Sequence, residues 1–456
     1  MSAVADSPLA AADVVAKVHA RECSAVELAQ QALAAAEALD PAINPFTELL
    51  ADRALAAAGR VDAAVGRGER PALAGVPLTV KESMWLEGLA AEMASPALRG
   101  HVAPATTTAI ARLEAAGAIV FARTTTPELC RGFATDTEIH GRTCNPLDLE
   151  RGVGASSGGA AAGLAAGVGC AALASDESGS IRLPAAFCGL VGHRPTQGAV
   201  PITPGFPQGA GMSTFGPLAR SARDALLLLD AMAAGGGTER LGQQLVPDDA
   251  RTPAHLAGST FLASPDLGGR APIGAAARER FGAVCAALAE AGATVLELPP
   301  LPDAGDAIFD WICADVSAHY APLVEAPGGV GARVRRLIDL GAALPAPRLS
   351  EIEALRDELF AAYALAFESS GAVAVLTPTL GFEALRHDEA MTPELADAPG
   401  DPWAFLYEAS LTGLPAVTIP MGVGEHGLPL GLQLMGRHRD DRLLLRLAQA
   451  LEPLLS

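Results

Sequence analysis

The chain has 456 residues, half of them hydrophobic, and a formal net charge of −20 at pH 7. A charge of this sign and size argues against a nucleic acid or an anionic membrane surface as partner. The seven cysteines are scattered, odd in number and never spaced as CxxC, which is typical of free thiols in a reducing compartment. No basic n-region or apolar leader opens the sequence. These features predict a cytoplasmic protein.

The first half of the chain alternates between helical and strand patterns. Ser24 is a good N-cap for an amphipathic helix that reaches about Leu39. Further helices are expected at residues 51–65, 106–116, 157–166 and 222–233. Short buried strands are expected at residues 76–80, 118–122 and 169–174, and a glycine turn at residues 235–237.

The second half returns to strands after a mainly helical stretch. Strands are expected at residues 260–264, 294–298, 372–377, 416–420 and 431–435. Helices are expected at residues 275–291 and 442–451, and helical segments fill much of 305–370.

This alternation predicts an α/β fold with a large mixed, mostly central β-sheet flanked by helices on both faces. The sequence contains no internal repeat and no long low-complexity linker. We therefore expect a single domain over residues 1–456. Residues 237–370 would form a more variable, mainly helical region at its periphery.

The use of lysine is unusual. Only Lys17 and Lys81 are lysines among the 32 basic residues. Arginine keeps its proton under almost all conditions, whereas burial can make a lysine neutral. Lys17 belongs to an amphipathic N-terminal helix and is expected at the surface. Lys81 ends the apolar run 75–80, so its deprotonation is expected to matter.

Two glycine- and serine-rich segments follow, GVGASSGG at 152–159 and DESGSIRLP at 176–184. Such turns let the backbone approach a ligand closely. A phosphate-binding loop would need a lysine after the last glycine, and none is present. The spacing GxSxG around Ser156 fits a nucleophile elbow, but the nine histidines lie in unrelated contexts. Taken alone, each segment is weak evidence.

The order of three motifs resembles that of the amidase signature family of serine hydrolases. The motifs are the Lys81 segment, the loop at 152–159 and the GSIRLPAA segment at 179–186. The likeness extends over nearly the whole chain and is weakest around 237–370. Supporting segments lie at residues 124–128, 141–146, 187–192, 412–416 and 427–433.

The resemblance implies a Ser–Ser–Lys triad in which Ser180 is the nucleophile, Ser156 the bridging serine and Lys81 the base. A serine hydroxyl is a weak nucleophile and needs an adjacent base. A lysine has an ordinary pKa of about 10.4, so burial must lower it by about three units for the amine to act near neutral pH.

The resemblance also assigns the groups around the triad. In the family, the bridging serine follows a cis peptide bond, here Ala155–Ser156. Asp176 and Arg182 would pair to hold the nucleophile loop, and Ser157 would assist the hydrogen-bond network. The oxyanion hole would consist of backbone N–H groups from Glu177, Ser178, Gly179 and Ser180.

Some positions depart from the family pattern. Glu82 and Ser83 replace its usual Asp-Asn after the lysine, and Ala155 and Ser178 stand where glycine is usual. None of these changes removes a member of the triad. They bear on the substrate and leave the mechanism unchanged.

The resemblance implies a hydrolase that cleaves a C–N acyl bond of a small molecule, an amide, anilide, carbamate or ester, through an acyl-enzyme. The segments expected to form the substrate walls are mostly apolar and lie at residues 84–93, 131–137, 204–212, 308–320 and 378–388. They carry the aromatic residues Trp85, Phe133, Phe206, Phe309 and Trp311, among others. If these line the pocket, a hydrophobic or aryl substrate is favoured.

Two alternatives remain open at this point. The chain could be the glutaminase subunit of a tRNA-dependent amidotransferase complex, or an inactive amidase-like scaffold. Neither an HExxH motif nor a dinucleotide-binding fingerprint is present, so we expect no metal and no cofactor. A homodimer is compatible with the sequence.

Overall fold

The computed structural model describes residues 9–207, 209, 211–233, 242, 244–247, 255–389, 391 and 395–455. The expected turn at 235–237 lies outside these residues. The helices are α1 (Ala11–Ala20), α2 (Ala25–Glu37), α3 (Ala51–Gly66), α4 (Thr108–Ala115), α5 (Gly158–Ala165), α6 (Arg182–Cys188), α7 (Ala222–Ala233), α8 (Ala275–Glu290), α9 (Ala307–Tyr320), α10 (Ala332–Ala343), α11 (Ala346–Ser370), α12 (Ala404–Thr412) and α13 (Asp441–Leu455).

Within the described residues, eleven strands form one sheet in the order β1-β3-β2-β8-β10-β9-β14-β15-β13-β11-β12. Two small hairpins, β4-β5 and β6-β7, lie outside it. The strands are β1 (Phe46–Leu49), β2 (Pro77–Lys81), β3 (Ile119–Thr124), β4 (Asp136–Thr137), β5 (Gly141–Arg142), β6 (Cys144–Asn145), β7 (Asp148–Gly152), β8 (Ala171–Asp176), β9 (Val191–Arg194), β10 (Thr214–Ala219), β11 (Thr260–Ala263), β12 (Thr294–Glu297), β13 (Ala374–Pro378), β14 (Ala416–Val423) and β15 (Pro429–Met435).

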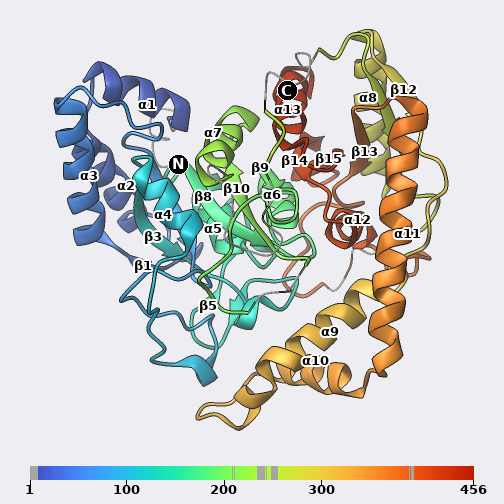
Figure 1. Cartoon of the computed structure of the whole chain (residues 1–456), viewed down its shortest axis with the longest axis horizontal. Coiled ribbons are helices and arrows are strands. Elements are labelled where there is room, and N and C mark those ends of the chain that lie inside the picture. The colour runs from blue at the N-terminus through green and yellow to red at the C-terminus, as the bar shows by residue number, and fades with distance from the viewer. Residues whose placement is uncertain are drawn as a thin grey trace.

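The sheet is mixed. β2 runs parallel to both β3 and β8, and β11 runs parallel to β12 and β13. The strands between these two groups pair antiparallel. In Figure 1 the helices α1–α3 lie beyond one end of the sheet, and α8 and α11 lie at the other. This mixed sheet with its flanking helices confirms the predicted fold class.

The patterned elements form where the sequence predicts them. Helix α2 begins after Ser24, whose side chain accepts from the backbone of Glu27 while Glu27 reaches back to the Ser24 N–H. This reciprocal arrangement satisfies two N–H groups at the start of the helix. Lys17, expected at the surface, is half-buried on α1.

Some central elements were missed. Strands β9 and β10 lie in the middle of the sheet and are fully buried, and neither was expected. β10 contains Gly216 and Pro217, residues that weaken a sequence-based strand assignment. Helix α6 was missed as well, because all of its residues are buried and it has no polar face to reveal a period.

The described part of residues 237–370 contributes to the main sheet. β11 and β12 pair with each other, and β11 pairs with β13. The rest is helical, and α11 alone has 25 residues. Figure 1 shows α9 and α10 side by side at the lower edge of the molecule, with α11 running along its side.

The sheet brings distant segments to one edge. Because β2 and β8 are parallel neighbours, with Val80 opposite Leu173, their carboxyl ends lie together. Lys81 ends β2, and Ser175 and Asp176 end β8. Helices α5 and α6 contact each other, and α5 packs on both strands. The serine-rich loops before these helices therefore open at the same edge.

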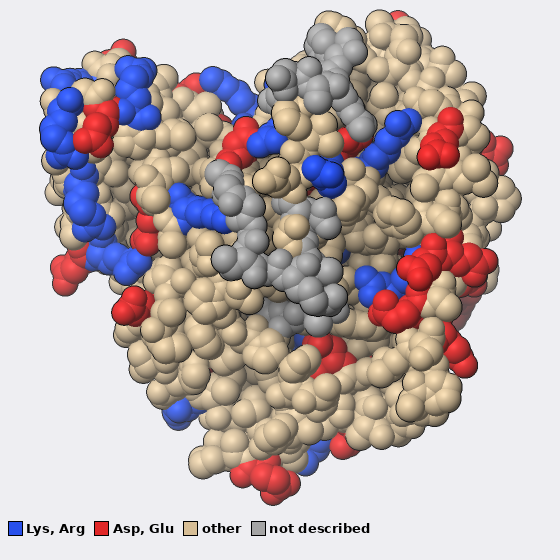
Figure 2. Space-filling model, viewed as in Figure 1, with Lys and Arg blue, Asp and Glu red and all other residues tan. Residues whose placement is uncertain are grey.

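On the face shown in Figure 2, Lys and Arg side chains gather over the N-terminal helices at the left of the view. Asp and Glu side chains are more numerous at the right of the same view. No helix in the described part of the chain has both the length and the apolar character needed to cross a membrane.

Candidate active site

Lys81 is completely buried at the end of β2. Its Nζ lies 2.6 Å from the Oγ of Ser156 and 2.9 Å from the Oγ of Ser175. Burial lowers the pKa of Lys81, and Arg131 lowers it further, whereas Cys130 and Asp176 oppose the shift. The neutral amine, the form that can accept a proton, is therefore favoured more than in an exposed lysine.

The loop that carries Ser156 depends on glycine. Gly154 has φ +73°, and a Cβ there would lie 2.9 Å from the Leu183 side chain. A cis peptide bond joins Ala155 to Ser156, as in the family that the sequence resembles. Gly158 begins α5, and a Cβ at this position would lie 2.2 Å from the Thr135 hydroxyl. Only glycine lets the loop and helix approach their neighbours this closely.

A backbone hydrogen bond ties the loop of Ser156 to that of Ser180. The N–H of Ser157 donates to the carbonyl oxygen of Ser180 across 3.2 Å. The Ser157 hydroxyl lies 3.3 Å from the carbonyl oxygen of Ser175. Ser156 and Ser180 line the same cavity. The structure thus brings Lys81, Ser156 and Ser180, which lie far apart in the sequence, into one place.

Asp176 and Arg182 form a fully buried, two-pronged ion pair. Nε and Nη2 of Arg182 each lie 3.0 Å from a carboxylate oxygen of Asp176. Burial by itself would raise the pKa of Asp176, but the charges of Arg182 and Arg194 outweigh it and hold the pKa well below its ordinary value. The Arg182 guanidinium also donates to Gln433, which connects the pair to β15.

The same carboxylate organises the backbone before Ser180. The N–H of Gly179 donates to Asp176 across 2.8 Å, and the N–H of Ile181 donates across 3.2 Å. Gly179 has φ +110°. Since the Gly179 donor already has a charged acceptor, an oxyanion hole here depends mainly on the N–H groups of Glu177, Ser178 and Ser180.

Ser175 and Cys130, which lie near the candidate triad, were not predicted for this site. Ser175 contacts Lys81, and its only sequence signal is its place beside Asp176. Cys130 and Arg131 lie on the short segment 128–131, where Leu129 and Cys130 both have positive φ. Arg131 was predicted only as part of a substrate-wall segment.

The cavity at the triad is small. Its volume is about 20 Å³, which is room for about one water molecule. Five serines line the cavity, together with a mixed set of apolar, polar and charged residues: Ser156, Ser175, Ser178, Ser180, Ser213, Met93, Leu129, Cys130, Arg131, Glu177 and Tyr320.

The five aromatic residues named from the sequence are absent from the lining of this cavity, although other residues of the expected wall segments, Met93, Arg131 and Tyr320, belong to it. The ring of Trp85 packs against that of Phe206, with centroids 5.5 Å apart, and Phe133 stacks on Trp403 at 4.1 Å. Trp311 is buried in a separate core cluster, and Phe309 is 47% exposed. The expectation of an aryl-lined pocket beside Ser180 is therefore not supported by the described structure.

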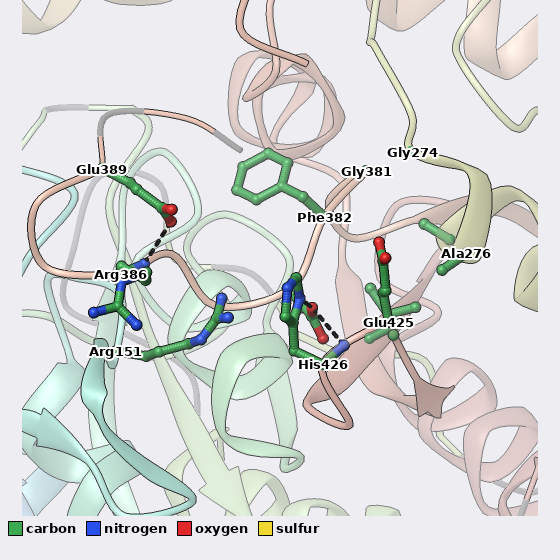
Figure 3. Close-up of a pocket in the computed structure, with 13 residues that line it drawn as sticks. Arg151, Gly274, Ala276, Gly381, Phe382, Arg386, Glu389, Glu425 and His426 are labelled. Carbon is green, nitrogen blue, oxygen red and sulfur yellow. Dashed lines mark hydrogen bonds and ion pairs between the residues drawn. The ribbon is translucent and has the colours of Figure 1, made fainter. Parts of the chain in front are cut away.

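Two larger cavities have no triad residue in their lining. One has a volume of about 420 Å³, and Figure 3 shows Arg386 and Glu389 on one side of it and Glu425 and His426 on the other. The other has a volume of about 360 Å³ and includes Phe133. Among the described residues, no group of three or more His, Cys, Asp or Glu could hold a metal ion.

Comparison with known proteins places this chain in a family. A model of the family Amidase matches residues 27–445. A glutamyl-tRNA(Gln) amidotransferase subunit from Koribacter versatilis (strain Ellin345) is 31% identical over an alignment of 477 residues, covering 95% of this chain and 96% of that protein.

Solved structures share the fold. A bacterial aryl acylamidase of the amidase signature enzymes family matches with a TM-score of 0.88 at 24% identity, covering 98% of this chain and 96% of that one. An amidase structure matches with a TM-score of 0.87 at 27% identity, covering 98% of this chain and all of that one. These findings confirm the predicted resemblance, and the chain belongs to the amidase signature family of hydrolases.

Proposed function

We propose that the chain hydrolyses a C–N acyl bond through an acyl-enzyme on Ser180, with Ser156 as the bridging serine and Lys81 as the base. The observation that carries this proposal is the position of the Lys81 amine. It is buried, has a lowered pKa, and lies 2.6 Å from Ser156 in the cavity that also contains Ser180.

The proposed steps follow from these positions. Neutral Lys81 takes the proton of Ser156 as Ser156 takes the proton of Ser180, and the Ser180 Oγ attacks the carbonyl carbon. The N–H groups of Glu177, Ser178 and Ser180 would stabilise the negative oxygen. The proton then passes back through Ser156 to the leaving nitrogen as the C–N bond breaks. A water molecule repeats the sequence to release the acid and free Ser180.

Asp176 and Arg182 support this chemistry without entering it. Their buried pair holds the backbone on both sides of Ser180 through the Gly179 and Ile181 N–H groups. Ser157 would keep the bridging serine aligned through its bond to the Ser180 carbonyl. Both tasks are positioning tasks, because neither set of groups is placed to exchange a proton with the substrate.

The cavity favours a small polar substrate over a large aryl one. Five serines, Arg131 and Glu177 line it beside Met93, Leu129 and Tyr320, and none of the five aromatic residues named from the sequence contributes to it. A small amide fits this lining better than an anilide or an aryl carbamate, because a bulky apolar group would displace more water from the polar groups without giving them a partner.

The second candidate is the glutaminase subunit of a tRNA-dependent amidotransferase. It is favoured by the Koribacter relative, whose name places it in such an amidotransferase and which aligns along nearly its full length. In that case the chain would act with partner subunits, and isolated protein would turn over slowly. As a stand-alone amidase it would need no partner or form a homodimer.

The test compares wild type with Ser180→Ala on a panel of amides. Ammonia release is measured from propionamide and glutamine, and amine release from an anilide and an aryl carbamate. We expect release from a small amide that disappears in Ser180→Ala. Release that persists in Ser180→Ala would overturn the proposed nucleophile. Activity with glutamine alone would favour the second candidate.

A further inference from the structure

Two charged residues that line the triad cavity, Arg131 and Glu177, meet a third, Asp315, behind them, and the proposed Ser–Ser–Lys mechanism does not use their side-chain charges. Arg131 pairs with Glu177 through one nitrogen, and its other terminal nitrogen lies 3.3 Å from Asp315 on α9. The side chains of the three residues are each no more than 11% exposed. We call Arg131, Glu177 and Asp315 the Arg131 cluster.

The Arg131 cluster has more negative than positive charge. It contains two carboxylates and one guanidinium. The other oxygen of Asp315 lies 3.1 Å from Nδ1 of His319, whose side chain is about one third exposed. Desolvation raises the pKa of Glu177, and Arg131 acts against this shift.

One oxygen of this cluster also has no partner in the described structure. Oε1 of Glu177 is buried and unpaired, although Glu177 lines the cavity with Ser180. A buried carboxylate oxygen without a hydrogen bond is unfavourable, because it has lost water without gaining a partner. Nε of Arg131 is buried and unpaired as well, and it offers an N–H to an uncharged acceptor such as a carbonyl oxygen.

Holding the nucleophile loop does not explain this arrangement. The Asp176–Arg182 pair already holds the loop, and it satisfies both of its carboxylate oxygens. A purely structural partner for Arg131 would need only one carboxylate. Glu177 and Arg131 line the cavity with Ser180, so their side chains are within reach of a ligand bound there.

We propose that the Arg131 cluster selects amides that carry an ammonium group, which Glu177 binds beside Ser180 while Arg131 holds Glu177 in place. This inference deepens the proposed function and rests on it. A substrate ammonium would balance the surplus charge and give Glu177 Oε1 its missing donor. A substrate carboxylate would add a further negative charge and be rejected.

The test uses matched substrates that differ in one terminal group. Primary amides of short ω-amino acids, with two to six carbons in the acyl chain, are compared with n-alkanoyl amides of equal length and with the corresponding ω-carboxylate amides. Ammonia release gives kcat/KM for each. In wild type we expect the order ammonium, neutral, carboxylate, with at least about tenfold between the first two at the best chain length.

The variant Glu177→Gln tests the residue. It keeps the size of the side chain and removes the charge, so the ratio between ammonium and neutral substrates should fall to about one. Glu177→Asp should restore part of the ratio. The matched control is Glu114→Gln, which breaks a partly exposed ion pair with Arg53 outside the Arg131 cluster. For this variant the ratio of kcat/KM between ammonium and neutral substrates should equal that of wild type.

Binding to Ser180→Ala separates this inference from the proposed function. Thermal shift is measured with the same three sets of amides, which this variant should not turn over. If Ser180→Ala binds ammonium amides preferentially and Ser180→Ala/Glu177→Gln does not, the proposed role of the Arg131 cluster is supported. This holds even if the wild type turns over none of the amides. The proposed selectivity would be overturned if Glu177→Gln lost turnover of all substrates while the preference for binding ammonium over neutral amides stayed unchanged. That result would show that Glu177 has a structural role only. A neutral or carboxylate preference across all chain lengths would also overturn it.

Discussion

The Oγ of Ser175 lies 2.9 Å from the Nζ of Lys81, across the parallel pair β2 and β8. This contact holds the lysine amine from one strand while Ser156 approaches it from the loop before α5. An amine with two fixed neighbours has a fixed direction for its lone pair. Ser175 is therefore placed to orient the proposed base.

Ser175→Ala should slow the reaction without unfolding the protein. Loss of one hydrogen bond worth about 1 kcal/mol should lower kcat about five- to tenfold. The Ser175 oxygen stabilises the charged amine, so its removal should lower the pKa of Lys81 further and move the rising part of the pH–rate profile to lower pH. Steady-state kinetics over a pH series measures both effects. Ser213→Ala, which removes another hydroxyl from the same cavity, should leave the position of the profile unchanged.

Activity should increase with pH through the lowered pKa of Lys81. The proposed base works as the free amine, so kcat/KM should rise as the proton is lost and level off above that pKa. Lys81→Met should reduce the rate by about a thousandfold or more, because the nucleophile then has no base. A Lys81→Met enzyme with wild-type rate and pH profile would contradict the triad.

The free energy of unfolding should also depend on pH because of Lys81. Between the lowered pKa of folded Lys81 and the ordinary pKa of the unfolded chain, the unfolded state binds more protons. The contribution of Lys81 to stability should therefore rise with pH in this window and be lost as pH falls through it. Urea unfolding at several pH values measures this effect. The free energy of unfolding of wild type, relative to that of Lys81→Met, should increase as pH rises through this window.

Breaking the buried pair should destabilise the fold. Asp176→Asn leaves Arg182 with an unbalanced charge in a fully buried site, at a cost of about 3–5 kcal/mol in the free energy of unfolding. Asp136→Asn breaks a half-exposed pair with Arg142 and should cost less than about 1 kcal/mol. Urea denaturation measures both. Equal effects of the two substitutions would contradict the anchoring role of Asp176.

The cysteines should differ in reactivity. All seven are free thiols, and burial raises the pKa of both Cys170 and Cys188 to about 12. These two should resist a thiol reagent in the native protein at pH 8 and react after unfolding. Cys23, Cys130, Cys144 and Cys285 are less buried, and they should react first. Peptide mass spectrometry of briefly labelled protein distinguishes them, and early labelling of Cys188 would contradict the described burial.

The elements predicted from the sequence are those with a local signal. The cap at Ser24, the amphipathic pattern of α2 and α3, and the apolar run that ends at Lys81 are each readable over a few turns or residues. β9 and β10 lacked such a signal, since a buried central strand with Gly216 and Pro217 resembles a loop. They form because strands on both sides supply their hydrogen-bond partners.

By itself, the sequence determined the fold class, the family and the three candidate triad residues, because these depend on local patterns and on the order of short motifs. Only the tertiary structure showed Ser175 beside Lys81, and the Arg131 cluster at the cavity. Arg131 meets Glu177 46 positions away and Asp315 184 positions away. Contacts between residues so far apart leave no periodic trace in the chain, because they arise only when the strands and helices that carry them pack together.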